Sequence, residues 1–242
     1  PTSWSGSYMI AGTETEGVAA IAINGVDLAG NSLTEVTATT DASSVEIDYT
    51  APDVTIDVGA SQDDPTNTSP VVFDVVFDEA IDLATFTNAD IDTSSSTSTL
   101  GSVSVSEVAP NDGTTFEVSI IVTGDGDVTA TVITGSVTDD AGNLNTASTS
   151  GDNTIAFETV LPTVSTITAD TDPVYEGDLA TEVVVTFSEV MDTATTPTIA
   201  ATTSSNFTVG AGAWSVGDTV YTVTLTHDGT DEEVAAETIT AN

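Results

Sequence analysis

The sequence predicts an all-β protein made of tandem antiparallel β-sandwich modules, and three observations support this prediction. Apolar residues make up 39% of the 242 residues, and they are mostly Val, Ile and Ala set among Thr and Ser, a composition typical of strands. Several segments alternate apolar and polar residues with a period of two, as half-buried strands do. Motifs also recur about 110 residues apart, which indicates a repeat architecture.

The expected strands follow from this alternation and from the turn sequences that separate them. Alternation is clearest from residue 116 to residue 122 and returns at Tyr221, Val223 and Leu225. Asp-Asp-Pro, Asn-Asp-Gly and Asp-Ala-Gly-Asn sequences favour turns between strands. The strands predicted from this pattern are 45–49, 54–58, 71–77, 102–108, 116–122, 128–137 and the 148–157 region, with 154–158 as its short last strand. Residues 232–237, the best helical candidate, are expected to be loop or strand. Short strands spaced in this way predict immunoglobulin-like topology.

Three motifs share the repeat distance. They are 76–82 and 186–192, which align Phe77 with Phe187; 51–54 and 161–164, which align Pro52 with Pro162; and 27–31 and 139–143, which align Asn31 with Asn143. The first two pairs are offset by 110 residues and the third by 112. We expect Phe77 and Phe187 to occupy equivalent buried positions.

The two prolines predict the module boundaries, because a proline after a short strand ends one ladder and fixes the entry to the next. Residues 1–50 are then the C-terminal part of one module, 51–160 a complete module, and 161–242 a module that lacks its last strand. This division leaves open sheet edges at both ends, and open edges recruit strands. One hypothesis is strand donation between successive filament subunits. The other, a window on a longer repetitive chain, is favoured because Trp4 and Trp214 occupy similar module positions.

The charge of this acidic protein excludes several functions. It contains 39 Asp and Glu, one His, and no Lys, Arg or Cys, for a formal net charge of −39. Binding to nucleic acid or to an anionic membrane surface needs basic residues, so neither partner is expected. Disulfides, thiol catalysis and phosphate-binding lysine loops are excluded in the same way. His227 lies in a turn-like Thr-His-Asp-Gly sequence, and no constellation of residues supports an enzyme.

These motifs, in this order and spacing, resemble the bacterial immunoglobulin-like (Big-type) tandem-repeat domains of giant extracellular adhesins and surface fibres. The resemblance rests on the two proline boundaries, the Phe77 and Phe187 segments, and the two Asp-x-Ala-Gly-Asn turns, and it covers essentially the whole chain. It implies an extracellular fibre of stacked sandwiches, often stiffened by calcium. Typical members carry some Lys, and this chain carries none.

Calcium is the cofactor that the acidic residues suggest, because hard divalent cations bind carboxylate and carbonyl oxygens and the chain has no Lys or Arg to neutralise its acids. In an immunoglobulin-like sandwich, the linker, the loop after the second strand and the hairpin before the last strand share the entry end of the module. The first junction therefore gathers Asp48, Asp53, Asp78, Glu79, Asp139, Asp140 and, as an additional candidate, Asn143. The second junction gathers Glu158, Glu189 and Asp192 with Asp125 and Asp127. Two alternatives stay open: the Asp-x-Ala-Gly-Asn turns need no metal, and an acidic surface can serve only to keep a fibre soluble.

The function expected from these observations is structural and adhesive. The chain is predicted to be a segment of an adhesin stalk or surface filament of the biofilm type, located outside the cell or on its surface. Its expected partners are neighbouring modules of the same chain or fibre, other copies in a filament, and a cell-surface or glycan receptor. The alternative is a carbohydrate- or protein-binding accessory module of a secreted protein, which the aromatic content of 5% disfavours.

Overall fold

The computed structural model shows an all-β chain whose strands pair in antiparallel sheets. It describes residues 3, 5–170, 180–201, 207–215, 217–229 and 239–241. The chain divides into two compact units, unit one (1–159) and unit two (160–242). Among the described residues, the sole helical element is a single 3₁₀ turn, η1 (Asn88–Asp90), and none of their helices has the length and apolarity to cross a membrane.

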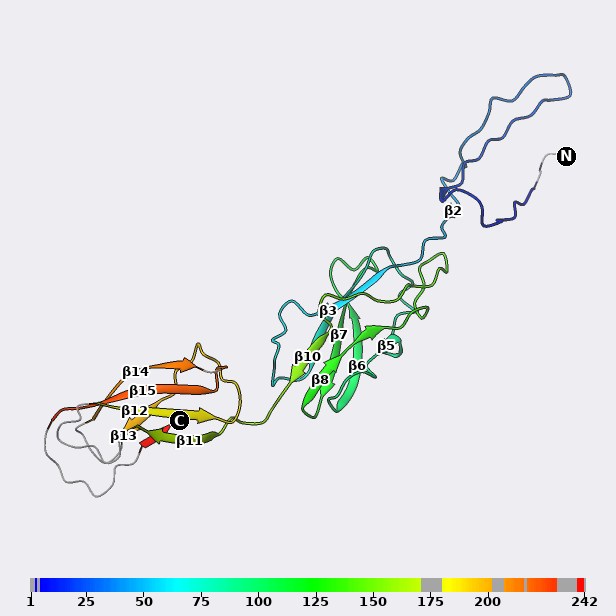
Figure 1. Ribbon diagram of the computed structural model, residues 1–242. Coiled ribbons are helices and arrows are strands. Elements are labelled where there is room, and N and C mark those ends of the chain that lie inside the picture. The colour runs from blue at the N-terminus through cyan, green and yellow to red at the C-terminus, as the bar shows by residue number, and fades with distance from the viewer. Residues whose placement is uncertain are drawn as a thin grey trace. The chain divides into compact units, whose positions relative to one another are not determined.

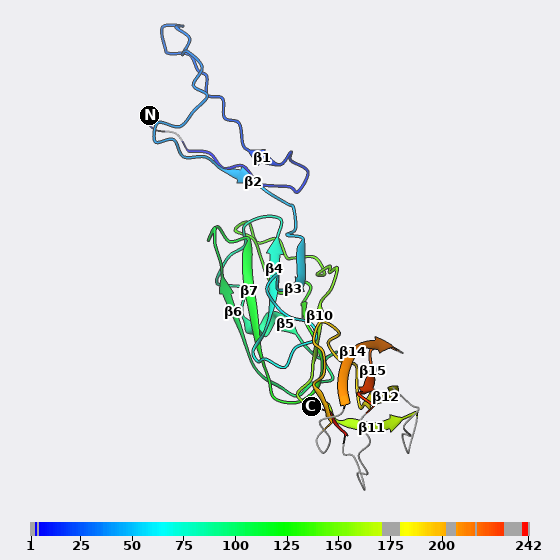
Figure 2. The same ribbon diagram turned by 90° about the vertical axis from the view of Figure 1, so that its left-hand side faces the viewer.

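Unit one is built around a four-stranded sheet in the order β3-β4-β7-β6 (Figure 2). Two short strand pairs, β10-β8 and β5-β9, contribute to the same core. The strand bounds are β3 (Val54–Val58), β4 (Val71–Phe77), β5 (Ile91–Asp92), β6 (Leu100–Glu107), β7 (Thr115–Val122), β8 (Gly126–Thr129), β9 (Thr131–Val132) and β10 (Thr154–Phe157). This arrangement is sandwich-like, with apolar side chains of both layers between them.

The core of unit one follows from the period-two alternation of its strands. Along β4, the side chains of alternate residues from Val71 to Phe77 are buried. The rings of Phe77, Phe86 and Phe116 meet edge to face, with centroid separations of 5.0 to 5.9 Å, a favourable geometry for aromatic pairs. Because Phe77 is anchored in this cluster, the loop that follows it leaves the sheet from a fixed point.

Unit two has a four-stranded sheet in the order β11-β12-β15-β14, and its short strands β13 and β16 pair separately (Figure 1). The bounds are β11 (Val164–Ala169), β12 (Ala180–Phe187), β13 (Ile199–Ala201), β14 (Phe207–Ser215), β15 (Val220–His227) and β16 (Ile239–Ala241). Phe187 is buried, as Phe77 is, and each pairs with a valine at the start of the preceding strand.

The segment before unit one's main sheet has little regular structure. Its strands β1 (Gly17–Val18) and β2 (Glu46–Ile47) form one short antiparallel pair. None of the described residues in 3–50 is buried, and large apolar side chains such as Tyr8, Met9 and Leu28 are exposed.

The strand predictions for 54–58 and 71–77 are confirmed, and that for 116–122 is met within one residue. The prediction of one strand over 128–137 is wrong. The chain changes partner at the buried Ala130, so that β8 pairs with β10 and β9 pairs with β5. The 45–49 and 148–157 regions shorten to β2 and β10. Residues 232–237 and Trp4 lie outside the described residues.

Candidate metal centre

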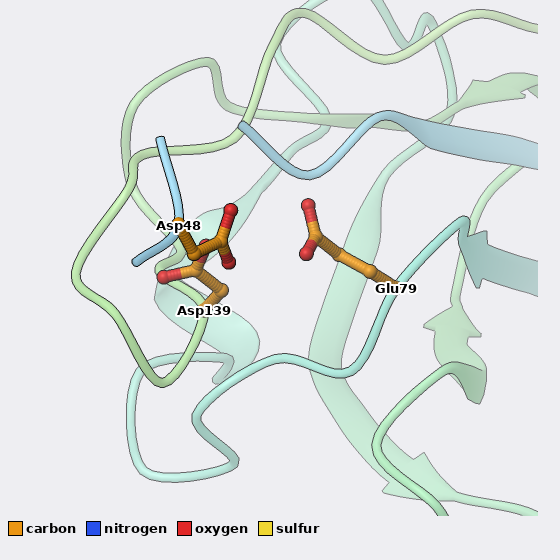
Figure 3. Close-up of side chains that lie close together, drawn as sticks. All are labelled: Asp48, Glu79 and Asp139. Carbon is orange, nitrogen blue, oxygen red and sulfur yellow. The ribbon is translucent and has the colours of Figure 1, made fainter. Parts of the chain in front are cut away.

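Three carboxylates from distant parts of the sequence converge on one side of unit one. Asp48 directly follows β2, Glu79 lies two residues after β4, and Asp139 belongs to the hairpin of residues 139–143. One carboxylate oxygen from each residue lies within 4.8 Å of the other two. Figure 3 shows the carboxylates of Asp48 and Glu79 turned toward each other, with that of Asp139 beside Asp48.

The hairpin holds Asp139 in a single orientation. The Asp139 Oδ1 atom accepts hydrogen bonds from the backbone N–H groups of Gly142 at 2.7 Å and Asn143 at 2.9 Å. Its Oδ2 atom accepts one from Asn143 Nδ2 at 2.8 Å. Gly142 has a φ of +93°, a conformation that glycine adopts without steric cost. The Asp-x-Ala-Gly-Asn sequence thus encodes both the turn and the placement of a carboxylate that is only 4% exposed.

Further hydrogen bonds fix the other two segments. The Asn143 Nδ2 group also donates to the main-chain oxygen of Asp48 at 3.3 Å, which ties the linker to the hairpin. The backbone N–H of Asp53 donates to Asp78 Oδ1 at 2.8 Å, and the N–H of Asp78 donates to the main-chain oxygen of Asp53 at 3.0 Å. These bonds join the linker to the loop that carries Glu79.

The pKa values of Glu79 and Asp139 shift in opposite directions. Burial raises the pKa of Glu79 above its ordinary value, and the nearby charges of Asp48 and Asp139 raise it further. Burial would raise the pKa of Asp139 as well, but hydrogen bonds from Asn143 and from the turn amides outweigh it, and the pKa is lowered. The Oε1 atom of Glu79 is buried and accepts no hydrogen bond from the described residues.

This arrangement can hold a metal ion. Oxygens that bind one calcium ion at about 2.4 Å lie no more than about 4.8 Å apart, and the three carboxylates meet that limit. The chain has no Lys or Arg to neutralise them. A bound cation would supply the partner that the buried Glu79 oxygen lacks among the described residues, and buried polar atoms without a partner are rare and costly.

The other residues expected at this junction lie outside the cluster of three. Asp53 and Asp78 are engaged in the hydrogen bonds that join linker and loop, and Asp53 Oδ1 also accepts one from Thr146 Oγ1 at 2.6 Å. Asp140 is exposed. Asn143 acts through its hydrogen bonds to Asp139 and Asp48.

The residues predicted for the second junction are divided between the two units. Asp125, Asp127 and Glu158 are exposed in unit one, where Asp125 Oδ1 accepts hydrogen bonds from the backbone and hydroxyl of Thr159. In unit two, Asp192 is exposed, and its Oδ1 atom accepts a hydrogen bond from the backbone N–H of Ala194. Glu189 is partly buried. A cation site formed by these five residues stays a prediction.

Sequence reasoning missed that Glu79 and Glu189 each have a buried carboxylate oxygen. The Oε1 atoms of both are buried and accept no hydrogen bond from the described residues. The signal that could have shown it is the alignment of the two motifs, in which Glu79 matches Glu189 but Asp78 matches Ser188. Asp78 and Ser188 do the same work, since each accepts a hydrogen bond from the backbone N–H of the residue after the boundary proline. The Glu residue is identical in the two motifs, whereas the acceptor before it is a carboxylate in one and a hydroxyl in the other.

Asp48, Glu79 and Asp139 form an acidic site that joins a linker to two loops of one sandwich. Comparison of the chain with models of protein families, with curated protein sequences and with solved structures gave no match.

Proposed function

We propose that this chain is a structural and adhesive segment of an extracellular repeat protein, an adhesin stalk or surface filament. In this proposal, its modules are tandem immunoglobulin-like sandwiches of about 110 residues that resemble Big-type domains, and calcium stiffens their junctions. The observation that carries the proposal is the cluster of Asp48, Glu79 and Asp139, in which a linker residue meets two loops of the following sandwich.

Three likenesses between separate parts of the chain support the proposed repeat. The four-stranded sheets of the two units have the same order of strands. The hairpins of residues 27–31 and 139–143 share two side-chain hydrogen bonds, in which the Asn backbone N–H and the Asn side-chain amide both donate to the first Asp. The pairing of Asp53 with Asp78 recurs as the pairing of Thr163 with Ser188.

A cation at this cluster would act on the linker. Carboxylates a few ångströms apart repel one another, and monovalent salt screens over about 8 Å at physiological strength, which is too far to quench that repulsion. A divalent ion bound by Asp48, Glu79 and Asp139 removes it and clamps the linker to the sandwich. Calcium sites of extracellular modules work at dissociation constants of about 10⁻⁴ to 10⁻³ M, which suits a surface protein.

The composition of the chain suits a long fibre that resists proteolysis. Trypsin-like proteases cut after Lys or Arg, and the chain has neither. The alternative of a carbohydrate-binding module needs exposed aromatic platforms. Phe77, Phe86 and Phe116 are buried in the core, and the exposed Tyr8 and Tyr49 both donate their hydroxyls to Glu14. The groove of about 490 Å³ beside Thr66 is lined by polar and acidic residues and one proline.

The proposal is tested by adding and removing calcium at constant ionic strength. We expect calcium to raise the melting temperature and to narrow the range of conformations seen by small-angle X-ray scattering, and EDTA to reverse both effects. A ligand that binds only the native state raises the free energy of unfolding by about 2.7 kcal/mol when its concentration is a hundredfold above Kd. A melting temperature and radius of gyration that are the same in calcium and in EDTA would refute the proposal.

A further inference from the structure

The hydrogen bonds of Asp139 leave one of its carboxylate positions open. A carboxylate has about four lone-pair sites, two on each oxygen. The Oδ1 atom of Asp139 fills both of its sites by accepting from the backbone N–H groups of Gly142 and Asn143. The Oδ2 atom accepts one hydrogen bond, from Asn143 Nδ2, and keeps one site open among the described residues. Oδ2 is therefore the Asp139 atom with room for a cation, and Asn143 is the residue that touches it.

The side-chain amide of Asn143 divides its two N–H groups between the hairpin and the linker, residues 48–53. One N–H donates to Asp139 Oδ2 at 2.8 Å and the other to the main-chain oxygen of Asp48 at 3.3 Å. Both of these oxygens can only accept hydrogen bonds, so the amide nitrogen has to face them. Within the described part of the chain, no other hydrogen bond joins the linker to residues 139–143. Asn143 thus contacts two of the three residues of the cluster.

The hairpin of residues 27–31 separates the two contacts of this amide. Asn31 Nδ2 donates to Asp27 Oδ2 at 2.8 Å, the same bond that Asn143 makes to Asp139. Asn31 makes no hydrogen bond to another segment of the described chain. The bond from Asn to the first Asp is therefore a property of the turn, and the bond to Asp48 is what the hairpin of residues 139–143 adds.

We infer that Asn143 is a positioning residue of the cation site, which couples binding of the ion at Asp139 to docking of the linker at Asp48. Its amide orients Asp139 Oδ2 and, through the main chain of Asp48, keeps the Asp48 carboxylate beside that atom. Removing such an outer-shell partner of a metal ligand lowers metal affinity by about 10- to 100-fold. The inference rests on the cation site of the proposed function.

Coupling of this kind acts in both directions. If the docked linker strengthens cation binding, the bound cation strengthens docking of the linker by the same factor. Loss of the Asn143 amide should therefore weaken calcium binding and also reduce the effect of calcium on the linker. An asparagine that served only to stabilise the turn would lower the stability of the fold and move neither quantity.

Isothermal calorimetry with calcium chloride on the EDTA-treated 242-residue chain gives the first measurement. Asn143→Ala is compared with Asn31→Ala, which removes the same amide from the other hairpin. Neither substitution changes the net charge, and alanine fits both backbones because neither residue has a positive φ. We expect Asn143→Ala to bind calcium about 10- to 100-fold more weakly than the wild type, and Asn31→Ala to bind it equally well. Circular dichroism at the temperature of the titration checks that both variants are folded.

Hydrogen–deuterium exchange of the linker amides gives the second measurement. In the wild type and in Asn31→Ala, calcium should slow exchange in residues 48–53 relative to EDTA. In Asn143→Ala, the linker should exchange at nearly its EDTA rate even when calcium saturates the site. A variant that exchanges faster only in residues 139–143, while calcium protects its linker as in the wild type, overturns the coupling.

Repeating Asn143→Ala in the Asp48→Asn background isolates the contribution of the linker. The part of the effect that passes through Asp48 is already absent there, so the loss of calcium affinity should be a smaller factor than in the wild type. Equal factors in the two backgrounds would show that Asn143 acts on Asp139 alone. If Asn143→Ala binds calcium as tightly as the wild type, the inference fails and the proposed function stands. If the wild type shows no saturable binding, both fail.

Discussion

The hairpins at 27–31 and 139–143 share the hydrogen bonds between their first Asp and their last Asn, but they have different surroundings. In both, the first Asp accepts bonds from the backbone N–H and the side-chain amide of the Asn four residues later. Asp27 is exposed, and no metal-binding group of three includes it among the described residues. Asp139 is 4% exposed and lies beside Asp48 and Glu79.

The difference between the hairpins separates what the motif encodes from what the tertiary structure adds. The Asp-x-Ala-Gly-Asn sequence is sufficient for the turn, because the turn forms where no core covers it. A cation site additionally needs a linker residue and the glutamate that follows β4.

The largest expected effect is on the stability of unit one. Asp139→Ala removes three hydrogen bonds to a buried charge and should lower the free energy of unfolding by at least about 3 kcal/mol. Bonds to charged groups contribute about 1.5–3 kcal/mol each, and the loss of like-charge repulsion beside Asp48 and Glu79 offsets part of their sum. Asp27→Ala should leave the main unfolding transition unchanged. Urea denaturation of both variants in EDTA measures the difference. Equal losses would show that burial adds nothing to the hairpin at 139–143.

A smaller effect of opposite sign is expected at Glu79. In EDTA, Glu79→Gln removes a charge that is buried beside two like charges and should raise the free energy of unfolding by about 1 kcal/mol, within the cost of an unsatisfied buried group. In calcium, the same variant should gain less stability than the wild type, because a ligand is lost. Thermal melts in both buffers check the two signs. A variant that is less stable than the wild type in EDTA would contradict the account.

The pH dependence in EDTA sharpens the comparison. The raised pKa of Glu79 means that its folded form favours the proton, so its contribution to stability is present at low pH and is lost as the pH rises through the folded pKa. The lowered pKa of Asp139 has the opposite consequence, since its contribution is lost as the pH falls. We therefore expect the advantage of Glu79→Gln over the wild type to shrink as the pH falls from 7 toward 4.5, the ordinary value for glutamate. An advantage that is constant with pH would count against the assigned environment of Glu79.

The smallest effect is expected at Asp140. Its side chain is exposed and lies outside the cluster, so Asp140→Asn should change neither the stability in EDTA nor the gain from calcium. Melting curves in the two buffers are the check. A loss of the calcium effect in this variant would extend the ligand set to Asp140.

Much of unit one could be predicted from the sequence, because period-two alternation marks strands whose two faces differ. The bounds of β3 and β4 were predictable for this reason. The change of partner at Ala130 was not, since alternation along one segment does not show which strand pairs with each part of it. The seven residues predicted for the first junction included the three carboxylates of the cluster. The sequence could not separate them from Asp53 and Asp78, because the tertiary structure decides which carboxylates meet one another and which meet only hydrogen-bond donors.

Calcium titration of the EDTA-treated chain by isothermal calorimetry tests the central claim most directly. The account predicts a saturable site at the cluster that is lost in Glu79→Gln and kept in Asp140→Asn. Weak, unsaturable heats that are identical in the wild type and both variants would contradict it, and would leave the cluster of Asp48, Glu79 and Asp139 as a solvated acidic surface.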